Sequence, residues 1–177
     1  IKINDIIKNA YKETKRSSLL VYLILRILVI ICMILQIIHG DLNNALLCLL
    51  SLILLMAPMF IQNKLAITLP DGLEISIYLF IFAAEILGEI NNFYGIIPFW
   101  DSILHTINGF LAAAIGYSLV DLLNRNSSKF NLSPFYLCIV AFCFSMTIGV
   151  LWEFYEYGSD RLFHFDMQKD TIVTSIS

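Results

Sequence analysis

Five stretches of the sequence are each long and apolar enough to cross a membrane as a helix, and they constrain the fold more than any other feature. A transmembrane helix needs about 20 mostly apolar residues, because the hydrocarbon core is about 30 Å thick and each helical residue rises about 1.5 Å. The chain is 59% hydrophobic and only 14% charged, which is typical of a membrane protein rather than of a soluble domain. We therefore predict an all-α, polytopic membrane helix bundle. The stretches are residues 18–38, 42–61, 73–92, 98–119 (extendable to Leu123) and 134–157.

The positions of Lys and Arg predict the orientation of this bundle. Basic residues lie before the first stretch, between the second and third, and between the fourth and fifth. Because cytoplasmic loops carry the excess of Lys and Arg, the N-terminus is predicted to be cytoplasmic and the segment after the fifth helix extracytoplasmic. The chain then divides into a basic cytoplasmic segment (1–17), a transmembrane bundle (18–157) and an acidic extracytoplasmic segment (158–177), a candidate start of a further helix.

Other patterns narrow the classes of function. The cysteines all fall inside apolar stretches and lack C-x-x-C spacing, so they are predicted to pack rather than to bind a metal. No phosphate-binding loop, dinucleotide fingerprint or nucleophile elbow is found, and no basic face interleaved with aromatic residues suggests nucleic acid. Membrane lipid is therefore the predicted partner, and no oligomeric state is predicted. The cysteines are Cys32, Cys48, Cys138 and Cys143.

Acidic residues and one histidine gather at the predicted extracytoplasmic ends of the last three stretches. They occur three or four positions apart, so each pair projects from one side of a helix. Small residues continue the same faces, which favours close packing between membrane helices and should bring the acids together. The pairs are Glu85 and Glu89, Asp101 and His105, and Glu153 and Glu156, with Asp166 and Asp170 following on the same side.

A bound cation is the predicted way to keep such a cluster ionised. Like charges at short range in a low-dielectric site cannot all stay charged without compensation, so a divalent metal is favoured and shared protons are the second solution. Carboxylate ligands with a single imidazole favour Mg²⁺, Mn²⁺, Ca²⁺ or Fe²⁺, and Zn²⁺ is also compatible. The predicted ligands are Glu85, Glu89, Asp101, His105, Glu153, Glu156, Asp166 and Asp170.

Each of these residues also has a structural interpretation. Asp101 is well placed to cap the helix that begins near Pro98, and His105 alone would be an ordinary packing histidine. Glu89 and Glu156 are compatible with a hydrated position at the membrane interface. Glu153 is harder to explain in this way, because it is enclosed by "LW" and "FY" within an apolar run.

Three motifs in order, "FWDSILHTINGFL", "LWEFYEYGSD" and "DMQKDT", give the chain a resemblance to the YjdF-like family of bacterial inner-membrane proteins. The resemblance covers residues 73–174 and implies a multi-pass protein of the bacterial inner (plasma) membrane with a polar site, rather than a particular reaction. Related chains continue into another apolar helix, so a sixth helix is expected beyond this sequence. The motif residues are Asp101, His105, Glu153, Glu156, Asp166, Lys169 and Asp170.

Three functions are compatible with these features. The favoured one is a metal-dependent hydrolase or transferase that acts on a lipid or lipid-linked substrate at the extracytoplasmic interface, with Glu153 or Glu156 as general base. The second is a cation or proton transporter that uses the intramembrane acids, although no inverted repeat supports it. The third is a non-catalytic membrane subunit whose metal is structural.

Overall fold

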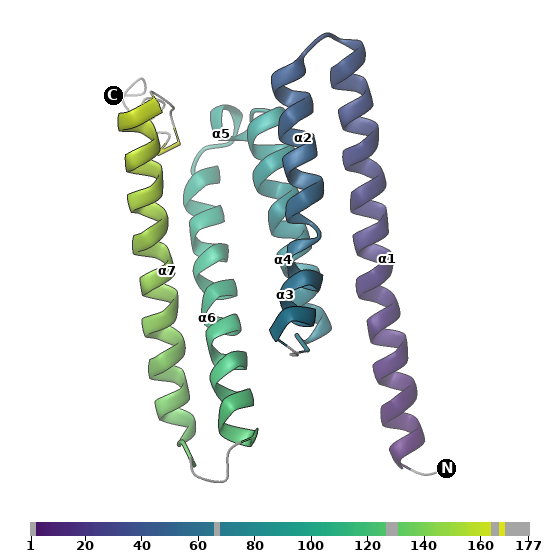
Figure 1. Ribbon diagram of the computed structural model, residues 1–177, viewed down its shortest axis with the longest axis vertical. Helices are drawn as coiled ribbons and strands as arrows, with labels where there is room; N and C mark the ends of the chain where they lie inside the picture. The colour runs from purple at the N-terminus through teal and green to yellow at the C-terminus, as the bar shows by residue number, and fades with distance from the viewer. Residues whose placement is uncertain (1–2, 66–67, 127–130, 164–166, 169–177) are drawn as a thin grey trace. The chain divides into compact units, whose positions relative to one another are not determined.

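The computed structural model describes residues 3–65, 68–126, 131–163 and 167–168, and all regular structure in these ranges is helical, which confirms the predicted class (Figure 1). The contacts divide the chain into two compact units, Ile1–Asn91 and Asn92–Ser177, which are described separately. The helices are α1 (Ile3–Ile38), α2 (Leu42–Leu54), α3 (Ala57–Leu65), α4 (Asp71–Phe82), the π-helix η1 (Ala83–Ile90), α5 (Phe93–Ile96), α6 (Trp100–Asn126) and α7 (Pro134–Phe163).

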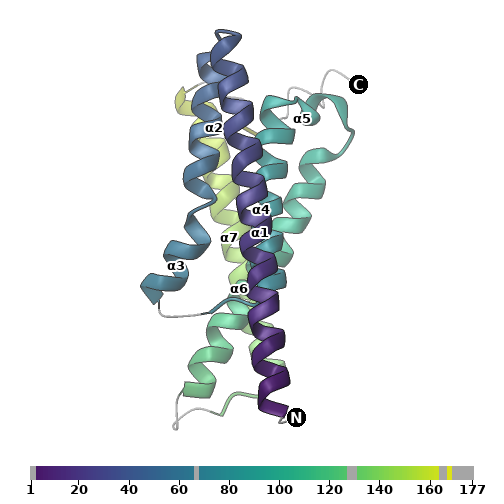
Figure 2. The same cartoon turned by 90° about the vertical axis from the view of Figure 1, so that its right-hand side faces the viewer.

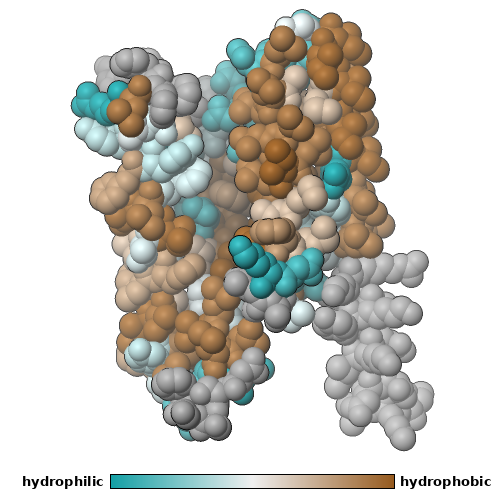
Figure 3. Space-filling view, in the orientation of Figure 1, coloured by the Kyte–Doolittle hydropathy of each residue, from teal (hydrophilic) through white to brown (hydrophobic). Residues whose placement is uncertain are grey.

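Most of the predicted membrane spans are single long helices. Within the described residues, four helical segments have the length and apolar composition needed to cross a membrane. The remaining predicted span, 73–92, corresponds to α4 followed directly by η1. Figure 3 shows apolar residues spread widely over the visible surfaces, as expected for helices whose outer faces meet lipid tails. The four segments are Ser17–Ile38, Leu42–Lys64, Trp100–Arg125 and Pro134–Leu162.

The first unit is built around α1, which contacts both α2 and α4 (Figure 2). Its core includes Val29, Cys48 and Leu55, none of which is exposed. Tyr78 of α4 is also buried and packs its ring against Tyr22 of α1, at 5.4 Å between centroids. These contacts join the three helices through side chains from each of them.

The second span differs from the single helix expected over residues 42–61. It is divided into α2, which ends at Leu54, and α3, which begins at Ala57. Pro58 explains the division, because its ring would clash with the carbonyl of Leu54, four residues earlier, and it has no N–H to continue the hydrogen-bond ladder. Proline is well tolerated in the first turn of the new helix.

The third span contains a π-helical segment that the hydropathy pattern did not predict. η1 covers Ala83–Ile90 and includes Glu85 and Glu89. It ends where the backbone N–H of Asn91 donates to the carbonyl of Ile86, a bond of the i→i+5 type. The side-chain amide of Asn91 donates to the same carbonyl at 2.6 Å, so one asparagine closes the last turn twice.

The second unit consists mainly of α6 and α7, which run antiparallel side by side (Figure 1). Small residues allow them to approach, and the hydroxyl of Ser145 on α7 donates to the backbone carbonyl of Gly109 on α6 at 2.7 Å. Leu104 and Leu111 of α6 and Ala141 of α7 are buried. This pair of helices carries the polar residues described below.

Gly116 of α6 lies close to Phe144 of α7 and allows a test of the packing between the two helices. A Cβ at Gly116 would lie 2.8 Å from Cδ1 and 3.0 Å from Cβ of Phe144 on α7. We expect Gly116→Ala to destabilise the protein by about 1–3 kcal/mol through overpacking, measured as a lower thermal unfolding temperature in detergent. Gly158→Ala on α7 is the matched control, because a Cβ there meets nothing within 4 Å. That variant should be unchanged or slightly more stable, because Ala is the better helix former; equal unfolding temperatures for the two variants would contradict the packing.

Candidate metal centre

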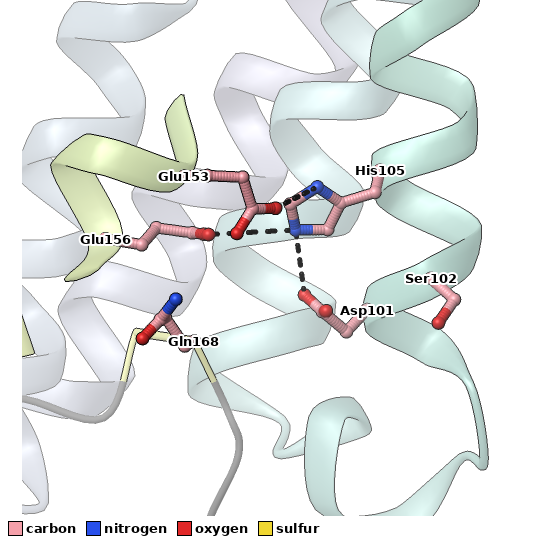
Figure 4. Close-up of a pocket in the computed structure, with 6 residues that line it drawn as sticks. All are labelled: Asp101, Ser102, His105, Glu153, Glu156 and Gln168. Carbon is pink, nitrogen blue, oxygen red and sulfur yellow. Dashed lines mark ion pairs between the residues drawn. The ribbon is translucent and has the colours of Figure 1, made fainter. Parts of the chain in front are cut away.

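The polar residues of the second unit meet near one end of the α6–α7 pair. Asp101 lies in the first turn of α6 and His105 one turn later, while Glu153 and Glu156 lie near the C-terminal end of α7. Because the helices are antiparallel, the start of α6 lies beside the end of α7. Figure 4 shows all four side chains turned toward one another.

The backbone before α6 helps to set this arrangement. Phe99 has a φ of +61°, a left-handed conformation that bulky residues rarely adopt. Such a residue costs on the order of 1–3 kcal/mol and persists only where the surrounding structure compensates for it. Here it turns the chain directly into α6, so that Asp101 falls in the first turn of that helix.

The imidazole of His105 has carboxylates on both of its nitrogens. Its Nε2 lies 3.5 Å from Oδ1 of Asp101 and 3.9 Å from Oε2 of Glu156. Its Nδ1 lies 3.7 Å from Oε1 of Glu153. These distances exceed those of strong hydrogen bonds, so the groups face each other with space between them.

The acids differ in their exposure to the surroundings. The side chain of Glu156 is only 7% exposed, whereas that of Glu153 is 55% exposed and that of His105 33%. Glu156 is fixed by Trp152, one turn earlier, whose indole N–H donates to its Oε1 at 2.6 Å. The other carboxylate oxygen of Glu156 remains directed at His105.

Two residues that follow α7, Met167 and Gln168, are held beside the same site. Both carboxylate oxygens of Asp160 accept backbone N–H groups, from Met167 at 2.7 Å and from Gln168 at 3.0 Å. Asp160 is therefore a positioning residue, and it holds Gln168 at the edge of the cavity (Figure 4). The cavity has a volume of about 530 Å³ and is lined by Asp101, Ser102, His105, Glu153, Glu156 and Gln168.

Of the predicted ligands, the second unit therefore brings together Asp101, His105, Glu153 and Glu156. Glu85 and Glu89 lie on η1 of the first unit, and their predicted place among the ligands stays a prediction. Asp166 and Asp170 lie outside the described residues, as does Lys169 of the same motif.

Sequence reasoning did not single out Trp152, Ser102 or Gln168 as parts of the site. Trp152 carried a usable signal, because it precedes Glu156 by four residues and so shares its helix face. Nothing in the sequence indicated Gln168, because its position depends on the two hydrogen bonds that the backbone N–H groups of Met167 and Gln168 donate to Asp160.

The fold and the site define a polytopic helical membrane protein with a histidine–carboxylate cluster near the end of two of its helices. Residues 20–175 match a family described as "Predicted membrane protein (DUF2238)", and the chain belongs to this family. It is also 30% identical over 94 residues to a protein of Thermotoga maritima described as "Uncharacterized protein". That match covers 53% of this chain and 47% of the relative, so it spans about half of each. No solved structure shows significant similarity to the chain.

Proposed function

We propose that the protein is a metal-dependent membrane enzyme, a hydrolase or transferase for a lipid or lipid-linked substrate, whose divalent ion is held by His105, Glu153 and Glu156. One observation carries the proposal: each of these residues offers a ligand atom, and the three atoms lie within 4.8 Å of one another. Two ligands of one ion lie at most twice the metal–ligand distance apart, which is about 4.0–4.4 Å for Zn²⁺ or Mg²⁺ and about 4.6–5.2 Å for Ca²⁺. The three side chains can therefore share an ion after small adjustments.

The charges of the site support a cation. Three carboxylates, those of Asp101, Glu153 and Glu156, surround one imidazole. Two like charges about 4 Å apart repel by about 4 kcal/mol at an effective dielectric constant near 20. Among the described residues of the site, a single protonated histidine leaves two of the three negative charges unbalanced, whereas a divalent ion bound to neutral His105 leaves one.

The surroundings of His105 also suit a metal ligand. When one imidazole nitrogen binds a metal, the other usually donates its proton to a carboxylate, which fixes the ring. His105 has a carboxylate on each side, from Asp101 at Nε2 and from Glu153 at Nδ1. Nδ1 can therefore bind the ion beside Glu153 while Asp101, at Nε2, orients the ring. Trp152 fixes Glu156 in a similar way.

The different exposure of Glu153 and Glu156 suggests a different role for each of them. Glu156, buried and fixed, is suited to holding the ion. Glu153, at the open side, can bind the ion through one carboxylate oxygen while the other takes a proton from an incoming water or hydroxyl group. A divalent ion here would supply an electrophile for a phosphoryl or acyl oxygen and would promote ionisation of water. Mg²⁺, Mn²⁺, Ca²⁺, Fe²⁺ and Zn²⁺ all fit this donor set.

The place of the site along its helices suggests a substrate drawn from the membrane. Asp101 begins α6 and Glu156 lies in the last two turns of α7, both within segments long enough to span a bilayer. A site at this level is reached by water from one side and by lipid headgroups. We also propose that the protein is YjdF-like and lies in a bacterial inner membrane. In this proposal the site is on the extracytoplasmic side.

A turnover experiment tests the enzyme. Purified protein in detergent is incubated with a lipid extract and each candidate ion in turn, and the products are followed by mass spectrometry. The expected result is metal-dependent conversion of a lipid with the mass change of hydrolysis or group transfer, lost in Glu153→Gln. A protein that binds the ion but converts no lipid with any of these metals would contradict the enzyme and favour a structural metal.

Trp152 provides a prediction about metal affinity. Trp152→Phe removes the N–H that fixes Glu156, and loss of such an outer partner typically lowers metal affinity about 10–100-fold. The measurement is titration of chelator-treated protein with the ion by calorimetry. Trp100→Phe is the matched control, because the buried Trp100 Nε1 has no hydrogen-bond partner within the described part of the chain. Equal affinities for the two variants would exclude a positioning role for Trp152.

A further inference from the structure

A second cavity lies on the same two helices, next to the candidate metal centre. Its volume is about 500 Å³, which is within the usual range for pockets that bind small molecules. The described residues that line it are all uncharged. Phe110 and Phe142 are strongly exposed beside it, so the cavity is an open apolar groove within the membrane-spanning part of α6 and α7.

The groove is next to the metal centre on both helices. On α6, Ser102 lines the polar cavity and Thr106 the groove, and the Thr106 hydroxyl donates to the Ser102 carbonyl at 2.7 Å. On α7, Gly149 lies one turn from Glu153 and one turn from Ser145 of the groove, and a Cβ at Gly149 would meet nothing within 4 Å. The α7 surface at Gly149, between Ser145 and Glu153, is therefore open.

The hydroxyl groups of Thr106 and Ser145, at the end of the groove near the metal centre, already donate hydrogen bonds to backbone carbonyls. The Thr106 hydroxyl is bonded to the Ser102 carbonyl and the Ser145 hydroxyl to the Gly109 carbonyl. At the end near the metal centre, the groove therefore offers a guest apolar contact rather than hydrogen bonds. A charged site that continues into an apolar channel at membrane depth is complementary to an amphiphile, with its head at one end and its chain at the other.

We propose that the α6–α7 groove binds one linear hydrocarbon chain of the lipid substrate, while the anionic head group of that lipid lies at the His105 centre. This inference rests on the proposed function, because it assigns the substrate of the same site. It makes Phe110, Phe142 and Cys138 chain-binding residues, with Cys138 toward the end of the groove far from the metal centre.

Photocrosslinking with positioned probes tests the inference. Two series of lipid phosphates, one acyl and one prenyl, carry a diazirine near the head, at mid-chain or near the tail, and the protein is labelled in nanodiscs. The expected result is a register: head-proximal probes label residues near Thr106, and tail probes label residues near Cys138. Competition by the matching unmodified lipid phosphate should remove the label, and the two series show which chain type is preferred.

A variant that fills the groove tests chain binding independently of metal binding. Ala113→Phe places a ring in the groove, and we expect about tenfold less labelling, or about 1.4 kcal/mol of lost binding, with unchanged metal content. Ala114→Phe on the same helix is the control, because Ala114 does not line the groove. Labelling without register or competition would show ordinary boundary lipid and overturn the inference. Groove residues crosslinked to another helix of this chain or of a second copy would overturn it as well.

Discussion

Replacing His105 with alanine is expected to remove the bound divalent ion from the purified protein. Wild-type protein, purified in detergent without chelator, should carry about one ion per chain, and His105→Ala should carry close to none. Loss of an outer partner of a metal ligand already lowers affinity about 10–100-fold, so loss of a direct imidazole ligand should lower it by more than about 100-fold. Elemental analysis by mass spectrometry measures the metal content and identifies the element.

His39→Ala is the matched control for this experiment. His39 also lies near a helix end, but its Nδ1 is 2.7 Å from the backbone carbonyl of Leu35, and the residue is exposed. Its removal should leave the metal content unchanged. If wild type and His105→Ala contain the same amount of every divalent metal, or none, then the cluster is not a metal centre and the proposed enzyme loses its basis.

The membrane fold could be predicted from the sequence because hydropathy over about 20 residues is a strong, local signal. The first, fourth and fifth predicted spans agree with α1, α6 and α7, although each of these helices extends beyond the predicted apolar stretch at one end. An apolar stretch ends where polar residues begin, whereas a helix continues as long as its backbone hydrogen bonds are formed. This is why residues 3–16 and 158–163 are helical although they are not part of an apolar stretch.

Interruptions within a span were less visible in the sequence. Pro58 was a usable signal for the division between α2 and α3, because proline restricts the helix that precedes it. The π-helical turns of η1 have no comparable signal in the sequence, and the two bonds from Asn91 to the Ile86 carbonyl at their end are visible only in the structure. The short helix α5 in the "NNFYGIIP" loop is likewise not predicted by hydropathy.

Part of the candidate site could also be predicted, because helical spacing fixes which residues share a face. Asp101 and His105 are four apart and Glu153 and Glu156 three apart, and the antiparallel pairing of two consecutive helices brings these pairs together. The contributions of Glu85 and Glu89 depend on packing between segments distant in sequence, which spacing alone does not determine. The role of Asp160 was hidden for a different reason, because its partners are backbone groups of Met167 and Gln168.

Glu156→Gln is expected to be more stable than wild type without the ion and less stable than wild type with the ion bound. Without an ion, the amide removes one of the three negative charges around His105 and can still accept the Trp152 hydrogen bond, so the variant should unfold at a higher temperature than wild type. With the ion at about 100 times its dissociation constant, wild type should gain about 2.7 kcal/mol, or about 5–10 °C, while the variant gains much less. Thermal unfolding in detergent, with chelator and with added ion, measures both orders.

The reversal distinguishes a bound cation from shared protons and from a hydrated rim of independent acids. Carboxyl groups that share protons would make the wild type insensitive to both chelator and metal, and a hydrated rim would make Glu156→Gln neutral in both conditions. Glu74→Gln serves as the control, since Glu74 accepts the Tyr78 hydroxyl at 2.7 Å in the first unit. Its effect should be the same with and without the ion. Only a cation bound among His105, Glu153 and Glu156 makes the carboxylate of Glu156 destabilising when the site is empty and stabilising when it is filled, because the same negative charge repels its neighbours in one state and binds the ion in the other.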